Sequence, residues 1–456
     1  MDWFFELPKA WCPTREAVDL EKDGRDWTRV LDPRPAAVVF PRCSEEVAEV
    51  LAFCTRYGIG VVPSGGRTGL CGGAMATQGE LVLSLERLRS LGQVDPLGLT
   101  LAVGAGVTTQ EVHQHCQPQG LTWPIDLASK GSSQIGGNLA TNAGGVRVLH
   151  YGPTRHWVTG LDVVLMDGTL LSCGGALYKD NTGLDLRQLM IGSEGILGVI
   201  TSATLRLTPL PRESQVLLLS IAELDQGLEL LANARVGARL DLLAFEYFDD
   251  SCMQAVQSVR RFSSPFAERA AGYILMEVEG GLEARLEDWF QSQLESGTIL
   301  DGVVAGTSSD KGRLWAFREN ITESLGHLGL MHKNDVAVSV KDLSRFAHQL
   351  RNQVASAYPG DVYLFGHVGD GNLHVNVMKP PEMAPEDFWP ACRAADVRLY
   401  ELLQSYGGSV SAEHGIGLLK KSALAYSRGP HEIQAMRQIK QSLDPQGLLN
   451  PGKVIS

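Results

Sequence analysis

Apolar and polar positions follow two different spacings at the start of the chain's patterned region. Residues 36–40 and 59–63 are short apolar runs typical of strands, whereas apolar residues within 47–54 recur every three or four positions. The second spacing places side chains on one face of a helix. Ser44 is suited to cap this helix and Gly58 to end it. The pattern therefore predicts a β-α-β unit.

The pattern changes after two prolines, Pro209 and Pro211. Apolar runs at 215–220, 240–247 and 273–278 are separated by longer amphipathic segments of helical spacing. We expect this region to form an α+β domain on an antiparallel sheet. The prolines mark the expected boundary between this domain and the preceding one.

A hairpin is predicted in the stretch DVYLFGHVGDGNLHVNVMK, which begins at residue 361. Two strands, 362–367 and 373–377, flank a Gly-Asp-Gly-Asn turn. With Asp370 and Gly371 at the centre of a type I′ turn, the residue before the turn at 367 faces the residue at 374. The register of the two strands then follows from the turn.

Both of these facing positions are histidines. Two imidazoles on directly opposed strand positions are close enough to bind one divalent metal ion. Asn376 lies on the same face as His374, because strand side chains alternate. Glu413, within SAEHGIG, is a candidate third ligand, and His414 is adjacent to it. The alternative is a surface hairpin with two unremarkable histidines.

Three Gly-rich segments occur in the first 200 residues: SGGRTGLCGG from 64, KGSSQIGGNLATNAGG from 130 and IGSEGILGVI from 191. Backbone N–H groups in such loops can surround phosphates. The first segment matches neither a Walker A loop nor G-x-G-x-x-G, so an ordinary nicotinamide site is disfavoured. Three segments fit a large, elongated cofactor better than a single phosphate. The alternative is that they are flexible turns.

The segment WAFRENITESL, residues 315–325, is predicted to be helical. Arg318 and Thr322 are four residues apart and would share a face of this helix. Together with Lys333 they could bind a carboxylate. The alternative is a solvated helix on which Arg318 pairs with a glutamate.

The composition of the 456 residues is that of an ordinary globular protein, with a formal net charge of −12. This charge argues against nucleic acid or an anionic membrane as the main partner. The eight cysteines are scattered without a C-x-x-C pair, which fits reduced thiols in the cytosol. We see neither a signal peptide nor a transmembrane segment and expect a cytoplasmic protein.

Six motifs occur in order along the chain: PSGGRTGLCGG, GGNLATNAGG, IGSEGILGVIT, GHVGDGNLH, SAEHGIG and LNPGK. Together they resemble the FAD-binding 2-hydroxy-acid dehydrogenase family, which includes glycolate oxidase, D-lactate dehydrogenase and D-2-hydroxyglutarate dehydrogenase. This family belongs to the vanillyl-alcohol-oxidase-type superfamily. The resemblance spans about residues 36–453. It implies an α+β fold: a PCMH-type FAD-binding domain over 1–209, an antiparallel-sheet substrate domain over 210–400, and a C-terminal segment, 401–456, that returns to the flavin.

The resemblance also implies which residues line the cofactor. Some superfamily members attach flavin to a histidine in the first loop; this loop has none, so non-covalent FAD is expected. The FAD-lining residues would be Pro63, Ser64, Gly65, Gly66, Arg67, Thr68, Gly69, Leu70, Ser132, Gly136, Gly137, Asn138, Thr141, Gly145, Glu194, Gly195, Ile200 and Asn450.

For the substrate region, the resemblance implies a metal ion, zinc or manganese, on His367, His374 and Glu413. His414 matches the proposed base. WAFREN-IT and HKND look most like the D-2-hydroxyglutarate branch, in which Arg, Thr and Lys hold the distal carboxylate. The expected substrate-binding residues are thus Arg318, Thr322, Lys333 and Asn376. Ser339 departs from the proline expected in that branch.

The expected reaction is oxidation of a D-2-hydroxy acid, above all D-2-hydroxyglutarate, to the 2-oxo acid. The metal would assist removal of the hydroxyl proton by His414, and hydride would pass to flavin N5. Electron-transfer flavoprotein or a quinone is the expected acceptor, and a homodimer is the assembly considered. The alternatives within the class are D-lactate dehydrogenase and a glycolate oxidase catalytic subunit. Outside it, they are a zinc hydrolase and a non-catalytic flavin-binding subunit.

Overall fold

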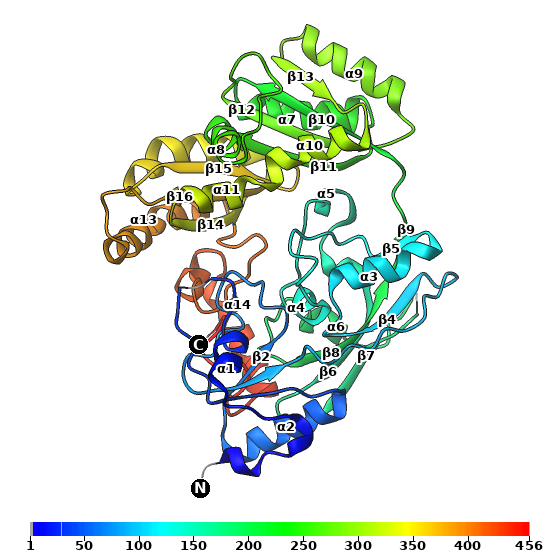
Figure 1. The fold of residues 1–456 in the computed structure, drawn as a ribbon, viewed down its shortest axis with the longest axis vertical. Coiled ribbons are helices and arrows are strands. Elements are labelled where there is room, and N and C mark those ends of the chain that lie inside the picture. The colour runs from blue at the N-terminus through cyan, green and yellow to red at the C-terminus, as the bar shows by residue number, and fades with distance from the viewer. Residues whose placement is uncertain (1–2, 29, 178, 456) are drawn as a thin grey trace. The chain divides into compact units, whose positions relative to one another are not determined.

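The structure is a computed structural model that describes residues 3–28, 30–177 and 179–455 (Figure 1). Contacts divide the chain into two compact units. Unit 1 comprises residues 1–145, 152–210 and 413–456, and unit 2 comprises 146–151 and 211–412. The chain therefore enters unit 2 twice and ends in unit 1. The domain bounds expected from the sequence, 1–209, 210–400 and 401–456, stay a prediction.

Unit 1 begins with the predicted β-α-β unit. Strands β1 (Ala37–Val39) and β2 (Val61–Ser64) both pair in parallel with β3 (Leu81–Ser84), which lies between them. Helix α2 (Ser44–Tyr57) connects β1 to β2 and buries its predicted apolar face. Gly58 ends it in the left-handed conformation, as expected, but the N-cap is Cys43 rather than Ser44.

A second, antiparallel sheet completes unit 1, with the strand order β4-β8-β6-β7. Its strands are β4 (Thr100–Gly104), β8 (Val199–Arg206), β6 (Val158–Val164) and β7 (Leu170–Gly174); a separate pair is β5 (Leu121–Thr122) with β9 (Thr208–Pro209). The other helices of unit 1 are α1 (Ala17–Asp23), α3 (Thr109–Cys116), α4 (Ile135–Ala140), α6 (Leu186–Met190) and α14 (Pro430–Leu443). Aliphatic side chains of the second sheet pack with α3 and α4 into one core.

Unit 2 is built on a seven-stranded sheet in which every neighbouring pair is antiparallel, so the predicted α+β architecture is confirmed. In spatial order its strands are β13 (Asp301–Val304), β10 (Ser214–Ile221), β12 (Gly272–Glu279), β11 (Leu242–Asp249), β15 (Val362–Gly366), β16 (Asn372–Met378) and β14 (Met331–Ala337). The central strands are buried along almost their whole length.

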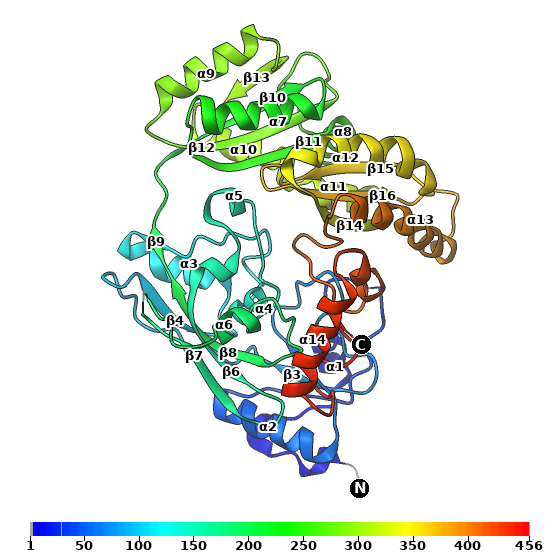
Figure 2. The ribbon, with the colours of Figure 1, turned by 180° about the vertical axis from the view of Figure 1, so that it is seen from behind.

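Helices lie on both faces of this sheet, as the opposite views in Figures 1 and 2 show. The helices of unit 2 are α5 (Val148–Tyr151), α7 (Leu224–Ala232), α8 (Asp250–Arg260), α9 (Glu283–Glu295), α10 (Ser308–Glu319), α11 (Ile321–Leu328), α12 (Leu343–Gln349) and α13 (Pro385–Ser405). One sheet face packs its apolar side chains against α8, α10 and α11. We call this face A, and the opposite one face B.

Candidate functional site

The predicted helix over residues 315–325 is in fact two helices. Helix α10 ends and α11 begins at Asn320, whose φ of −83° and ψ of −1° break the regular helix. The prediction that Arg318 and Thr322 share one helical face is therefore wrong. Arg318 is 8% exposed and reaches face A of the sheet, whereas Thr322 is exposed at the start of α11.

The hairpin forms, but with a different turn and register. Phe365 pairs with His374, and four residues, 368–371, close the loop instead of two. The backbone N–H groups of Asp370 and Asn372 both donate to the carbonyl of His367, at 3.1 and 3.2 Å. His367 therefore faces Asn372, not His374 as predicted. A longer loop allows this register because Gly371 takes a φ of +88°.

The two histidines nevertheless lie close together on face A. A shift of two residues keeps every side chain on its own face, so His367 and His374 become diagonal rather than direct neighbours. Their ring centroids are 5.6 Å apart, with the planes at 79°. The pairing of imidazoles predicted from the sequence is thus retained with a different geometry.

Each histidine has a carboxylate beside it. Glu246 Oε1 lies 2.7 Å from His367 Nδ1, and Asp335 Oδ1 lies 3.5 Å from His374 Nδ1. Asp335 is opposite His374 in the sheet and also accepts a hydrogen bond from Asn372 Nδ2 at 2.8 Å. A carboxylate on one ring nitrogen fixes the orientation of the imidazole.

Glu246 also holds Arg318. Its Oε2 lies 2.9 Å from Arg318 Nε, and the guanidinium carbon lies 5.0 Å from the ring centroid of Phe365. Burial alone would raise the pKa of Glu246, but the charges of His367 and Arg318 outweigh it and hold this pKa below its ordinary value. The expected alternative of a glutamate partner for Arg318 is met, but in the interior rather than on a solvated helix.

Lys333 and Asn376 complete the polar part of face A. They are directly opposite each other on β14 and β16, and His374 is two residues from Asn376 on the same side of the strand. Burial lowers the pKa of Lys333. Within the described part of the chain this amine has no ion-pair partner. Five of the predicted residues therefore share one face of unit 2: Arg318, Lys333, His367, His374 and Asn376.

In unit 1, the first and second Gly-rich segments are in backbone contact. A Cβ on Gly66 would lie 2.2 Å from the carbonyl oxygen of Ser132, so only glycine fits. The guanidinium of Arg67 pairs with Asp23, Nη1 to Oδ1 at 2.6 Å. The Asn138 amide donates to Thr109 Oγ1 at 2.7 Å. These two side chains thus join the first Gly-rich segment to α1 and the second to α3.

The third Gly-rich segment meets the C-terminal motifs. Both oxygens of the Glu194 carboxylate accept backbone N–H groups, those of Ile416 and Gly417, at 2.7 and 2.8 Å. Burial raises the pKa of this carboxyl against the effect of those two donors. Asn450 Nδ2 donates to the carbonyls of Gly73 and Glu194, at 3.0 and 2.8 Å. Motifs 222 to 377 residues apart in sequence therefore converge in unit 1.

The remaining expected cofactor residues lie in the same loops and their flanks. Gly136 and Gly137 are in α4, Gly195 follows Glu194, and Ile200 is buried in β8 as part of the unit's core. Thr141 Oγ1 donates to the carbonyl of Gly137 at 3.0 Å. Pro63, Ser64, Gly65, Thr68, Gly69, Leu70, Ser132 and Gly145 lie at the end of β2 or in the first two Gly-rich segments.

Two models of known protein families match this chain. Residues 35–174 match the FAD-binding domain model, and residues 210–454 match the C-terminal domain model of the FAD-linked oxidases. The chain belongs to the FAD-linked oxidase family. The FAD-binding domain model covers the first two Gly-rich segments, as expected, and the third, from 191, lies beyond the matched residues.

Curated relatives match this chain along nearly its full length. A D-2-hydroxyglutarate dehydrogenase of Xanthomonas citri pv. viticola is 46% identical over 443 residues, which cover 96% of this chain and 93% of the relative. One of Stutzerimonas stutzeri is 39% identical, with coverage of 97% and 95%. A mitochondrial D-2-hydroxyglutarate dehydrogenase of Bos taurus is 38% identical, with coverage of 96% and 80%.

Solved structures show that the chain has the expected vanillyl-alcohol-oxidase-type α+β fold. An alkyldihydroxyacetonephosphate synthase matches with a TM-score of 0.73, covering 98% of this chain and 82% of that one. At 17% identity this likeness concerns the fold alone.

Sequence reasoning missed Glu246, the carboxylate that contacts both His367 and Arg318. Its signal is an acidic residue inside LLAFEYFD, a strand whose eight residues are all buried. A carboxylate in such a run must be paired. Nothing in the sequence says that its partners are 72 and 121 residues away.

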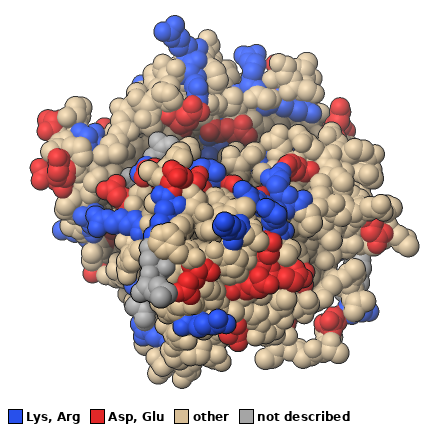
Figure 3. Space-filling view, turned by 60° about the horizontal axis from the view of Figure 1, so that its bottom comes forward, with Lys and Arg blue, Asp and Glu red and all other residues tan. Residues whose placement is uncertain are grey.

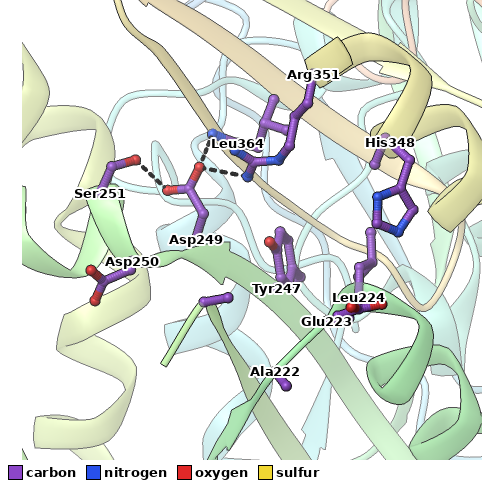
Figure 4. Close-up of a pocket in the computed structure, with 12 residues that line it drawn as sticks. Ala222, Glu223, Leu224, Tyr247, Asp249, Asp250, Ser251, His348, Arg351 and Leu364 are labelled. Atoms are coloured by element: carbon purple, nitrogen blue, oxygen red, sulfur yellow. Dashed lines mark hydrogen bonds and ion pairs between the residues drawn. The ribbon is translucent and has the colours of Figure 1, made fainter. Parts of the chain in front are cut away.

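A cleft of about 370 Å³ lies on face B of unit 2 (Figure 4), and none of the polar residues described on face A lines it. Asp249 accepts hydrogen bonds there from Ser251 Oγ, Arg351 Nη2 and the backbone of Leu364, at 2.6, 3.0 and 3.0 Å. The cleft is lined by Tyr247, which alternates with Glu246 along β11. The polar residues of face A thus belong to a different surface.

Charged side chains of both signs are interspersed over the described part of the face drawn in Figure 3. Such mixing differs from the basic stripe of a nucleic-acid-binding surface. Among the helices described, none is both long and apolar enough to cross a membrane.

Proposed function

We propose that this protein is a D-2-hydroxyglutarate dehydrogenase, which oxidises the 2-hydroxyl of a five-carbon dicarboxylate to a ketone while FAD is reduced. Relatives of that name are 38–46% identical over nearly the whole chain. The observation that carries this proposal is a cluster of polar groups on one face of the sheet. It holds two cations and two imidazoles, and each imidazole has a carboxylate partner.

Arg318 and Lys333 would bind the distal carboxylate, which lactate and glycolate lack. Glu246 engages Arg318 through Nε, so the terminal nitrogens remain to form the fork that binds a carboxylate. Lys333 is a partly buried amine whose pKa is lowered by burial. A substrate carboxylate would offset that desolvation, whereas a monocarboxylic acid would leave the amine as it is.

His367, His374 and Glu413 would hold a divalent cation, zinc or manganese. Nitrogen and carboxylate oxygen are suitable zinc ligands, and the carboxylates beside both histidines orient them as in many zinc sites. The backbone N–H of Ala412 lies 3.4 Å from the carbonyl oxygen of Asp335. Glu413 follows Ala412 directly, so chain connectivity supports its inclusion.

The Gly-rich loops would hold FAD through backbone N–H groups, without a covalent bond to histidine. When bound, FAD supplies the two-electron acceptor and the cation supplies a Lewis acid. His414 would accept the hydroxyl proton as general base. Arg318 and Lys333, with Asn376 and Thr322 as further contacts, would orient the C2 carbon by fixing the other end of the substrate.

Anaerobic mixing of the purified yellow protein with candidate substrates tests the proposed reaction. D-2-hydroxyglutarate should bleach the flavin absorption, whereas its L isomer should not. D-lactate, D-malate and glycolate are matched controls because they shorten or remove the distal carboxylate arm. Bleaching by D-lactate or glycolate, with none by D-2-hydroxyglutarate, would refute the substrate and favour the lactate or glycolate alternative.

Arg318→Ala tests the distal carboxylate contact. A hydrogen bond to a charged group contributes about 1.5–3 kcal/mol, so kcat/KM for D-2-hydroxyglutarate should fall roughly 10–100-fold. The value of kcat/KM for D-lactate, measured on the same preparation, should change little, and any fall in it reports a general loss of activity. An equal loss of kcat/KM with both substrates would show that Arg318 does not bind the second carboxylate.

His374→Ala tests the metal. The variant should lose the bound divalent ion, measured by elemental analysis, together with activity, while it keeps FAD in its absorption spectrum. Full turnover by a metal-free variant would exclude a role for the cation in the reaction.

The same proposal includes an electron acceptor, an oligomeric state and a cellular location. Electron-transfer flavoprotein or a quinone would reoxidise the flavin, and a homodimer in the cytoplasm is the expected form. Relatives from Bos taurus and Danio rerio carry "mitochondrial" in their names. Reoxidation kinetics with each acceptor, light scattering and cell fractionation test these three points, and rapid peroxide production from oxygen would contradict the assigned acceptors.

A further inference from the structure

Glu246 has an unusual combination of environment and partners. It is 1% exposed, in the middle of strand β11, on the apolar side of the sheet that packs against α8, α10 and α11. A buried carboxylate is costly unless both of its oxygens are satisfied. Here each oxygen has one partner on a different element: His367 after β15 and Arg318 on α10.

We propose that Glu246 is a positioning residue that couples retention of the metal ion to recognition of the substrate's second carboxylate. This inference rests on the proposed function, because it takes His367 as a metal ligand and Arg318 as the contact for that carboxylate. Glu246 itself touches neither the ion nor the substrate. It acts by holding one group of each kind.

The His367 contact decides which ring nitrogen is available. Glu246 Oε1 accepts a hydrogen bond from Nδ1 at 2.7 Å, so the proton of the neutral ring resides on Nδ1. Nε2 then carries the lone pair and is the atom that can bind a cation. The same contact fixes the ring plane, as carboxylates do in many metal sites.

The Arg318 contact fixes the guanidinium from its inner edge. Glu246 Oε2 accepts from Nε at 2.9 Å, and the ring of Phe365 lies 5.0 Å from the guanidinium carbon. A planar fork held at Nε has its terminal nitrogens set in direction before a ligand arrives. Because one carboxylate makes both contacts, loosening either partner frees Glu246 to move away from the other.

The coupling predicts a change in metal affinity that electrostatics alone would not produce. Arg318 is a cation on the same sheet face as the proposed ligands, so its removal would tighten binding of a divalent ion if charge repulsion were its only effect. If Glu246 instead links the position of Arg318 to that of His367, removal of Arg318 releases the carboxylate, disorders His367 and weakens binding of the ion. Charge repulsion thus predicts tighter metal binding in the variant, and positioning predicts weaker binding.

The experiment measures zinc affinity by chelator competition in the FAD-loaded full-length protein. Arg318→Met and Glu246→Gln should each weaken zinc binding about 10–100-fold, the range typical of lost outer carboxylates. The double variant should be no weaker than Glu246→Gln, because both changes break the same bridge. Zinc affinity of Arg318→Met equal to or tighter than that of the unmodified protein would overturn the proposal.

Two matched controls come from the same face. Lys333→Met removes a neighbouring cation that makes no hydrogen bond or ion pair with Glu246 among the described residues, so zinc affinity should stay equal or become tighter. Glu277→Gln alters a buried carboxylate on β12, which pairs with Arg147 and Ser214 at 3.3 and 2.6 Å instead of with the histidine. Its zinc affinity should be unchanged. Loss of zinc in Glu277→Gln equal to that in Glu246→Gln would mean general destabilisation and would also overturn the proposal.

A second measurement separates positioning from a structural role. In Glu246→Gln with saturating zinc, KM for D-2-hydroxyglutarate should rise about tenfold or more relative to that for D-lactate. An unchanged ratio would overturn the proposal even if Arg318→Met failed to fold. Failure of the proposed function is recognised separately, because the unmodified protein would then bind no zinc or would not reduce its flavin with D-2-hydroxyglutarate.

Discussion

Lys453, in the C-terminal motif LNPGK, should make the stability of the protein depend on alkaline pH. The side chain is 1% exposed, and its Nζ has no hydrogen-bond partner among the described residues. Burial lowers the pKa of this amine from 10.5 to about 8, partly opposed by the charges of Glu80 and Asp26. Asp26 in turn accepts the backbone N–H of Gly72 in the first Gly-rich segment, at 2.8 Å.

The sign follows from proton binding. Between pH 8 and pH 10.5 the unfolded chain holds a proton on Lys453 that the folded protein has released, so stability rises with pH in this window. The difference in protons bound by Lys453 in the unfolded and folded chains, integrated from pH 7 to pH 10, is about 1.8 protons·pH. This corresponds to a rise of roughly 2.5 kcal/mol in the free energy of unfolding. Below pH 7 the full cost of burying the ammonium is present and no longer changes.

The assay compares unfolding of the unmodified protein and Lys453→Met in guanidinium at constant excess FAD, at several pH values. Release of FAD and circular dichroism both follow the transition. Only the difference between the two proteins is used, because buried thiols such as Cys54 and Cys116, with pKa values raised to about 12 and about 11, titrate with the opposite sign. Lys9→Met, which changes an exposed lysine of the same unit, is the control.

The free energy of unfolding of the unmodified protein should rise relative to that of Lys453→Met by about 2.5 kcal/mol between pH 7 and pH 10. The same difference for Lys9→Met should stay flat. A flat difference for Lys453→Met would refute the reasoning, because it would mean that this amine titrates alike in the folded and unfolded chains.

Three further predictions concern single contacts. Gly66→Ala should lower FAD affinity, measured by fluorescence titration, because its Cβ would lie 2.2 Å from the Ser132 carbonyl; unchanged affinity would show that the loops can separate freely. Asp396→Ala should destabilise unit 2 by about 3 kcal/mol in denaturant unfolding, since the buried Asn334 amide and Tyr358 hydroxyl lose a partner at 2.7 and 2.8 Å; a change below about 0.5 kcal/mol would contradict this. Phe248→Ala should cost about 3–5 kcal/mol by leaving a cavity in the face A core, measured in the same way; a loss under 1 kcal/mol would mean that the core collapses around it.

Local patterns were sufficient for elements whose signals lie within a few residues. The apolar positions of α2 and the glycine after it predicted the helix and its end, because helix period and left-handed capping are local properties. The hairpin was likewise expected at its observed place. Its register was wrong by two residues because a four-residue loop and a two-residue turn use the same Gly and Asp residues. The break at Asn320 was missed, although an Asn followed by a Glu three residues later is a local signal for the start of a helix.

The sequence by itself determined which residue types were available, the Gly-rich segments of an FAD-binding domain and the strand order along the chain, because these are written in spacing and composition. Only the tertiary structure decided that Arg318 turns inward while Thr322 stays exposed, and that Glu246 meets both Arg318 and His367. Such contacts depend on which strands become neighbours in the sheet. Pairing across 72 and 121 residues is set by packing of the whole unit, not by any local pattern.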